Sequence, residues 1–222
     1  MKLDKHEAKN RIAKRIAKEF LEDENIEIIN LGVGIPTLVA NYIDSNEICI
    51  QTENGMLGVG PEASENEKDV ELINAGRIPI TEMKGCCYFD SAMSFGMIRA
   101  GHVDATVIGA LQVDERANVA NWTVPNSKQL GVGGAMDLVT GVKKVVVATR
   151  HMTKQGEPKI VKECSYPVTG FNKVNLIVTE LAVFEFVNNK LTLREIFPDI
   201  TVGELREITE AEFQDRTRGK SK

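Results

Sequence analysis

Apolar residues recur at helical spacing in the first part of the chain. Ile12, Ile16 and Phe20 lie four residues apart, with alanines beside them. This spacing puts them on one face and predicts a helix over residues 5–22. Arg11 and further basic residues fall on the opposite face. Such a helix can lie on a membrane surface. Because the apolar stripe is narrow and rich in alanine, we expect instead that the basic face lies in water.

Strand-like and helical segments alternate along the rest of the chain. Strands are predicted at residues 26–31, 47–51, 105–111, 143–149, 175–179 and 183–187. Helices are predicted at residues 36–42, 91–99 and 135–140 and from about residue 209, the last with a frayed end. Asn188-Asn189 is typical of a hairpin turn. The alternation predicts an α/β fold with a mostly parallel sheet flanked by helices. We find no repeat or linker, so we expect residues 1–222 to form one domain.

Composition and charge exclude several classes of protein. Hydrophobic residues make up 42% of the chain and charged residues 27%, as in a globular protein. The net charge of -5 argues against a general nucleic-acid binder. No apolar segment approaches membrane-spanning length, so no membrane partner is expected. The four cysteines lack zinc-site spacing and are expected to be reduced thiols, and no metal site is expected. The N-terminus lacks an apolar signal core, so the expected location is the cytoplasm.

A carboxylate among small residues is the first candidate for chemistry. Glu53 follows a short apolar run and is followed by Asn54 and Gly55. Glycines allow close approach of a ligand or of another backbone segment. A carboxylate at the end of a strand, beside such space, is a candidate nucleophile. Considered by itself, Glu53 fits a surface salt bridge better.

Two glycine-rich segments are candidates for ligand contact. Gly32 and Gly34 partly match a dinucleotide-binding turn, but the third glycine is missing, and a tight turn lining a crevice explains them. Residues 131–134 precede a predicted helix. Backbone N–H groups there could bind a phosphate or the oxyanion of a tetrahedral intermediate. A glycine-capped connection explains that segment equally well.

Other conspicuous residues favour structural roles. His102 and Asp104 suggest a hydrolase pair, yet no serine lies in a Gly-x-Ser-x-Gly elbow. His102 is therefore expected to be mainly structural. His151 closes a predicted strand and is a weak candidate for a site near the sheet edge. Asn121-Trp122 could wall a pocket, although the tryptophan is better explained as a core or interface anchor. The sequence assigns no role to Cys86-Cys87.

Several of these segments together resemble family I coenzyme A transferases, and in particular the B (beta) subunit of the acetate/butyrate–acetoacetate and 3-oxoacid enzymes. They occur in family order over nearly the whole chain, and the Glu-Asn-Gly and Gly-Gly-Ala-Met-Asp segments are together highly specific. The resembling segments are residues 30–36, 53–60, 73–76, 97–104, 109–113, 120–122 and 131–139.

The resemblance implies roles for individual residues. Glu53 matches the family's nucleophile, and Gly134 matches the residue whose backbone donates to the oxyanion. The neighbouring candidates for lining the oxyanion or coenzyme A site are Gly133, Ala135, Asn54 and Gly55. The candidates for a wider pocket are Gly32, Gly34 and Asn121.

The resemblance also implies the reaction and the partners. CoA would move from a short-chain acyl-CoA to a carboxylic or 3-oxo acid, such as acetoacetate, acetate or butyrate, by a ping-pong mechanism through a glutamyl-CoA thioester. Coenzyme A would be a substrate, with no permanently bound cofactor. An A (alpha) subunit would complete the site, in an expected A2B2 heterotetramer.

Two alternatives remain open from the sequence. The fold is expected to be related in architecture to ribose-5-phosphate isomerase. A sugar-phosphate isomerase would use Glu53 as a base and residues 131–134 to hold phosphate. A non-catalytic CoA-binding subunit would bind the ligand without forming an adduct.

Overall fold

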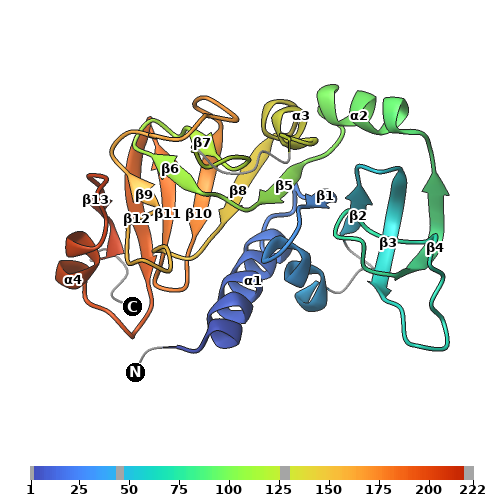
Figure 1. Cartoon of the computed structure of the whole chain (residues 1–222), viewed down its shortest axis with the longest axis horizontal. Helices are drawn as coiled ribbons and strands as arrows, with labels where there is room; N and C mark the ends of the chain where they lie inside the picture. The colour runs from blue at the N-terminus through green and yellow to red at the C-terminus, as the bar shows by residue number, and fades with distance from the viewer. Residues whose placement is uncertain (1–2, 44–47, 126–130, 218–222) are drawn as a thin grey trace.

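The computed structural model describes residues 3–43, 48–125 and 131–217. A ten-stranded sheet runs through it in the order β13-β12-β11-β10-β8-β5-β1-β2-β3-β4, and a small three-stranded sheet lies beside it in the order β7-β6-β9 (Figure 1). The helical elements are α1 (Lys5–Leu21), the 3-10 helix η1 (Pro36–Tyr42), α2 (Ser91–Arg99), α3 (Ala135–Gly141) and α4 (Val202–Glu207). The strands of the first half are β1 (Ile28–Leu31), β2 (Cys49–Thr52), β3 (Met56–Glu62), β4 (Ile80–Tyr88), β5 (Ala105–Ile108), β6 (Gln112–Asp114) and β7 (Val119–Ala120). Those of the second half are β8 (Lys144–Ala148), β9 (Ile160–Val161), β10 (Val174–Val178), β11 (Ala182–Val187), β12 (Lys190–Ile196) and β13 (Gln214–Asp215).

The centre of the large sheet is parallel and its two ends are mainly antiparallel. Strands β10, β8, β5, β1 and β2 pair in parallel. Beyond β2, the strands β3 and β4 continue antiparallel, and beyond β10 the strands β11 and β12 do the same. The short β13 pairs in parallel with β12. The predicted α/β fold with a mostly parallel sheet and flanking helices is therefore confirmed, with two antiparallel ends that the sequence analysis did not specify.

Helices cover both faces of the parallel strands. Ile29 belongs to the core that includes the α1 residues Ile12, Ile16 and Phe20, which are at most 1% exposed. Ile28, its neighbour on β1, packs instead with the α2 and α3 residues of a smaller core. Successive strand residues point to opposite faces, so α1 and η1 lie on one side of β1 and α2 and α3 on the other.

Helix α1 is held by its own cap and by burial of its apolar stripe. The Asp4 carboxylate accepts hydrogen bonds from the backbone N–H groups of His6 and Glu7, and the Glu7 side chain accepts one from the Asp4 backbone. Because Ile12 and its neighbours pack in the core of this same chain, the stripe is not available to a membrane surface. In the described part of the chain, no helix has the length and apolar character needed to cross a membrane.

A second core lies beneath the antiparallel end formed by β11 and β12. Phe184 and Phe213 meet there edge to face, with ring centroids 5.2 Å apart. The hairpin between β11 and β12 turns at Asn188 and Asn189, both of which have positive φ angles. This turn matches its prediction, because asparagine tolerates the left-handed region better than most residues.

Several predicted boundaries are corrected by the structure. The predicted strand 105–111 ends at Ile108, and β6 starts at Gln112. The predicted helix 36–42 is a 3-10 helix. The first residue of the predicted strand 47–51 lies outside the described residues, and β2 covers Cys49–Thr52. Strands β3 and β4 were not predicted.

The predicted helix from about residue 209 is wrong. Helix α4 ends before it, at Glu207, and the Thr209 hydroxyl donates to the Leu205 carbonyl. The backbone N–H groups of Glu210 and Ala211 then bond to the Ile160 carbonyl. These long-range bonds and the burial of Ala211 hold the segment against β9 and prevent a helix there.

Strand β4 forms one edge of the large sheet. Its residues pair with β3 on one side only, and the described residues supply no further strand on the other side. Glu82, Lys84 and Cys87 on this strand are exposed. Gly85 has a φ of +87°, and the register between β3 and β4 shifts along their length.

Candidate active site

A tight turn places Glu53 directly after β2. The Gly55 N–H donates to the Thr52 carbonyl at 3.0 Å, and the Phe89 N–H donates to the Gly55 carbonyl at 3.0 Å. Gly55 has a φ of +132°, and a Cβ atom there would lie 2.1 Å from the Phe89 carbonyl oxygen. Only glycine fits this position. The turn leaves the Glu53 side chain half-buried.

Thr52 and Asn54 tie the turn to the segment before β4. The Thr52 hydroxyl donates to Asn54 Oδ1 at 2.5 Å and accepts from the Ala75 N–H at 3.1 Å. Asn54 Nδ2 donates to the Ile73 carbonyl at 3.1 Å. The side chain of Asn54, predicted as a ligand-lining residue, thus holds the loop that carries Glu53.

Buried amides lie behind the Glu53 carboxylate. Asn30 on β1 donates through Nδ2 to Glu53 Oε2 at 3.0 Å and to Gln51 Oε1 at 2.8 Å. Gln51 Nε2 donates to Ser94 Oγ at 2.7 Å. Parallel pairing sets Asn30 opposite Gln51 on the neighbouring strand, which explains how residues far apart in sequence meet here.

The glycine segment before α3 reaches Glu53 from the side of α2 and α3. A Cβ atom at Gly134 would lie 3.6 Å from Glu53 Cγ and 2.7 Å from Phe95 Cζ. The structure therefore brings together Glu53 and Gly134, the two residues predicted to be catalytic, although 81 positions separate them (134 minus 53). Gly133 is exposed and has a φ of +59°, while Ala135 is half-buried and begins α3.

Helix α2 packs against α3 beside the site. Arg99 Nη1 donates to Asp137 Oδ1 at 2.8 Å, and the guanidinium lies 5.9 Å from the centre of the Phe95 ring. In the described part of the chain, no group of three or more histidine, cysteine, aspartate or glutamate side chains is arranged to hold a metal ion.

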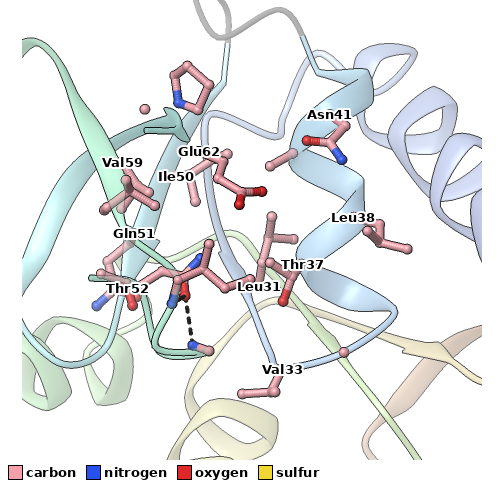
Figure 2. A pocket seen from close by; sticks show the side chains of 18 residues that line it. Leu31, Val33, Thr37, Leu38, Asn41, Ile50, Gln51, Thr52, Val59 and Glu62 are labelled. Carbon is pink, nitrogen blue, oxygen red and sulfur yellow. Dashed lines mark hydrogen bonds between the residues drawn. The ribbon is translucent and has the colours of Figure 1, made fainter. Parts of the chain in front are cut away.

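A cavity of about 280 Å³ lies between η1 and the strands β2 and β3 (Figure 2). Gly34 and Thr52 are among its lining residues, and Glu53 is not. Gly32 is packed at the end of β1, where its N–H donates to the Val107 carbonyl at 2.9 Å. Asn121 lies elsewhere, because its Oδ1 accepts from the Thr169 hydroxyl at 2.7 Å beside the small sheet. The structure does not gather the predicted wider pocket of Gly32, Gly34 and Asn121 around one cavity.

The histidines and Asp104 have structural contacts. Asp104 accepts from Lys143 Nζ at 2.6 Å and from the backbone N–H groups of Glu27 and Ile28. Burial alone would raise the pKa of the Asp104 carboxyl, but these donors outweigh it and hold the pKa below its usual range. His102 is exposed, and its backbone N–H donates to the Met97 carbonyl.

His151 is fully buried in the second half of the chain. Its ring nitrogens lie 3.3 Å from the Thr179 hydroxyl and 2.9 Å from the Thr209 hydroxyl. Burial lowers the pKa of His151 to about 4, so the ring is neutral near pH 7. These contacts anchor it between β10 and the segment after α4.

Sequence reasoning missed Asn30, Gln51, Ser94 and Phe95. A signal was present for the first two, since each is a polar residue inside a short apolar strand. A polar side chain at such a position is normally hydrogen-bonded. Its partner could not be named without the strand register.

The chain belongs to the coenzyme A transferase family. Residues 9–207 match the family described as Coenzyme A transferase. This assignment agrees with the fold and with the closeness of Glu53 to Gly134.

Two bacterial relatives are 48% identical to this chain. One is the B subunit of a probable succinyl-CoA:3-ketoacid coenzyme A transferase from Bacillus subtilis, with 93% of this chain and 95% of the relative aligned. The other is the beta subunit of an acetate CoA-transferase from Escherichia coli, with 94% of each chain aligned.

A solved structure supports the fold. It is the acyl-CoA transferase YdiF from Escherichia coli O157:H7, which matches with a TM-score of 0.74 at 18% identity. The match covers 98% of this chain and 43% of the YdiF chain, so this chain spans less than half the length of that protein.

Proposed function

We propose that this chain is the beta subunit of a CoA-transferase that moves CoA between short-chain carboxylic or 3-oxo acids. The observation that carries the proposal is the closeness of Gly134 to Glu53, with a Gly134 Cβ position 3.6 Å from Glu53 Cγ. This closeness places the proposed nucleophile beside the glycine whose backbone N–H is the proposed oxyanion donor. The names of the two bacterial relatives favour acetate and 3-oxo acids as the acceptor class.

In the first half-reaction, Glu53 attacks the thioester carbonyl of the acyl-CoA. The carboxylate is itself the nucleophile, so this step needs no general base. The carbon–sulfur bond breaks, and an acyl-glutamyl anhydride and CoA thiolate form. The thiolate then attacks the glutamyl carbonyl, which releases the first carboxylate and leaves a glutamyl-CoA thioester.

The second half-reaction reverses these steps with another acid. Its carboxylate attacks the glutamyl thioester, CoA thiolate leaves and then attacks the new acyl group, and Glu53 is regenerated. No proton is transferred in the cycle. Coenzyme A is thus a substrate, and the chain needs no permanently bound cofactor for this chemistry.

The protein must stabilise the negative charge that forms on the carbonyl oxygen. We assign one donor to the backbone N–H at Gly134, with Gly133 and Ala135 beside it. Removing one such donor in other enzymes costs about 2.7–4 kcal/mol of transition-state stabilisation. Water must also be excluded, since it would hydrolyse the anhydride and the thioester.

An A subunit completes the site in this proposal. The two bacterial relatives are named as B and beta subunits, and the YdiF chain is more than twice as long as the segment matched here. We expect the purified chain alone to be inactive and an A subunit to restore CoA transfer, in an A2B2 heterotetramer. Mass measurement of the reconstituted complex tests this stoichiometry, and a different subunit ratio would exclude it.

A covalent adduct on Glu53 is the direct test. The complex with an A subunit is incubated with acetoacetyl-CoA, digested and analysed by mass spectrometry. We expect CoA on the peptide that contains Glu53. Freshly prepared Glu53→Gln should form no adduct, while Glu157→Gln, a change at an exposed glutamate, should behave as the wild type. An adduct on another residue, or near-normal turnover of Glu53→Gln, would remove Glu53 as the nucleophile.

The same assay separates the two alternatives. A sugar-phosphate isomerase would interconvert its substrate with no CoA exchange. A non-catalytic CoA-binding subunit would bind acyl-CoA and leave Glu53 unmodified.

A further inference from the structure

Polar side chains behind Glu53 form a buried row across four elements. Asn30 on β1, Gln51 on β2 and Ser94 on α2 are 0%, 1% and 0% exposed, and Thr106 on β5 is 0% exposed. Burying polar groups costs free energy unless they are hydrogen-bonded. Apolar residues would fill this space at lower cost, so the row calls for an explanation beyond packing.

The hydrogen bonds fix the direction of both amides. Gln51 Nε2 donates to Ser94 Oγ at 2.7 Å, which turns Gln51 Oε1 towards Asn30. Asn30 Nδ2 then donates to that oxygen at 2.8 Å and to Glu53 Oε2 at 3.0 Å. The Thr106 hydroxyl donates to Asn30 Oδ1 at 3.4 Å, which supports the same orientation. A reversed Asn30 amide would set its oxygen against two other oxygens.

We propose that Gln51 and Ser94 are positioning residues for Glu53, acting through the Asn30 amide. They hold the Asn30 N–H towards one carboxylate oxygen and leave the other oxygen free to attack the substrate. This inference rests on the proposed function of Glu53 as the nucleophile. It adds a role for two side chains whose hydrogen bonds in this row go to each other and to Asn30, and not to the Glu53 carboxylate.

Helix α2 links this row to the oxyanion donor. Ser94 contacts Gln51, and the next residue, Phe95, packs against Gly134. The nucleophile and the donor are therefore aligned by adjacent residues of one helix. Small errors in such alignment are costly, because rate depends steeply on the geometry of the reacting atoms.

The effect of placing a carboxylate at position 51 depends on the ionisable groups around it. Those on the elements packed around the row are Glu53 and Cys49 beside Gln51, Glu62 on β3, Asp90 at the N-terminal cap of α2, Arg99 on α2, and Asp137 on α3. Arg99 is paired with Asp137, and Asp90 accepts from the Met93 N–H at the start of α2. Among these groups, Glu53 is the one joined to Gln51 through Asn30.

Gln51→Glu tests the inference in the complex with an A subunit. The rate of CoA adduct formation on Glu53 is measured in a single turnover between pH 5 and 9. A second carboxylate behind Asn30 disfavours ionisation of the pair. We expect the acidic limb of the profile to move up by about one pH unit or more, so that the loss relative to the wild type is largest at pH 5 and disappears by pH 8.

Ser94→Ala is the second variant and introduces no charge. It leaves the Gln51 amide free to turn, and we expect adduct formation about tenfold slower with an unchanged KM. Thr209→Val is the matched control, because it removes a buried hydrogen bond to His151 in the other core. It should change neither the pH profile nor the adduct rate.

Each outcome has one meaning. If Gln51→Glu keeps the wild-type profile, or if Ser94→Ala reacts as fast as Thr209→Val, the positioning role is refuted. If Gln51→Glu fails to assemble, Ser94→Ala decides alone. If the wild type itself forms no adduct on Glu53, the proposed function has failed, and that result is seen before any variant is compared.

Discussion

Adding a single methyl group at Gly134 tests the geometry of the candidate active site. Gly134 has φ and ψ angles of -83° and 3°, which alanine can also adopt. The effect of Gly134→Ala is therefore steric. The new Cβ atom would lie 2.7 Å from Phe95 Cζ and 2.8 Å from Phe95 Cε1. Carbon atoms in contact prefer about 3.5–4.0 Å, so one side must move by roughly 0.8 Å or more.

The glycine segment is expected to move, because it is less tightly held than Phe95. Gly131 and Gly133 are exposed, whereas Phe95 packs with the buried residues of the core between α2 and α3. The overpacking should lower the free energy of unfolding by about 1–3 kcal/mol. Displacing the oxyanion donor should reduce kcat by about 10²–10³-fold, the effect of losing one such donor.

Phe95→Leu provides a matched background for this test, since leucine lacks the two ring atoms that would collide. CoA exchange between acetoacetyl-CoA and acetate is measured in the presence of an A subunit for the wild type, for Gly134→Ala, for Phe95→Leu and for the double variant. In the Phe95→Leu background, Gly134→Ala should cost less than about tenfold, because the two changes share one contact. If Gly134→Ala reduced kcat equally in the wild-type and Phe95→Leu backgrounds, the collision with Phe95 would not be what displaces the Gly134 N–H.

Three further outcomes test other parts of the structure. Burial lowers the pKa of His151 to about 4, so on acidification the unfolded chain takes up the proton before the folded chain does. In urea titrations, the unfolding free energy of the wild type relative to that of His151→Gln should therefore fall by up to about 3 kcal/mol as the pH drops from 6.5 to 4. Parallel plots of unfolding free energy against pH for the two proteins would contradict this. Burial raises the pKa of Cys164 to about 12, so iodoacetamide at pH 8 should modify exposed Cys87 and spare Cys164 until the protein is denatured. Glu19→Ala removes the carboxylate shared by Arg15, Lys144 and Arg194 and should lower the free energy of unfolding by about 1–3 kcal/mol in thermal unfolding. The control Glu24→Ala, at an exposed glutamate, should lower it by less than about 0.5 kcal/mol. Similar losses for the two variants would show that these ion pairs do not stabilise the fold.

Sequence periodicity predicted the elements that have one buried face. The spacing of Ile12, Ile16 and Phe20 predicted α1, and α2 occupies the predicted residues 91–99. Such patterns are local, because they follow from the geometry of a single element. The predicted parallel centre likewise followed from the alternation of strands and helices.

Strands β3 and β4 were missed for a physical reason. Gly58 and Gly60 in β3 lower strand propensity, and glycine in a strand often marks close approach of another backbone. A Cβ atom at Gly58 would lie 2.9 Å from Cys86 Cα, and one at Gly60 would lie 2.7 Å from the Thr81 carbonyl oxygen. The glycines thus serve the pairing of β3 with β4, a long-range contact that local patterns do not contain.

The candidate site was partly predictable. The resemblance to the family pointed to Glu53 and Gly134, and the structure places them side by side. The hydrogen-bonded row behind Glu53 was not predicted, because the contact of Asn30 with Gln51 depends on the register between β1 and β2. A register of this kind is set by the whole sheet and not by either strand.

The edge of the large sheet at β4, beyond which the described residues supply no further strand, bears on association between copies of the chain. The outer edge of a terminal strand can serve as a template on which identical chains stack. Charged Glu82 and Lys84, together with the irregular backbone at Gly85, interrupt that template. These features disfavour edge-to-edge association of copies of this chain through β4.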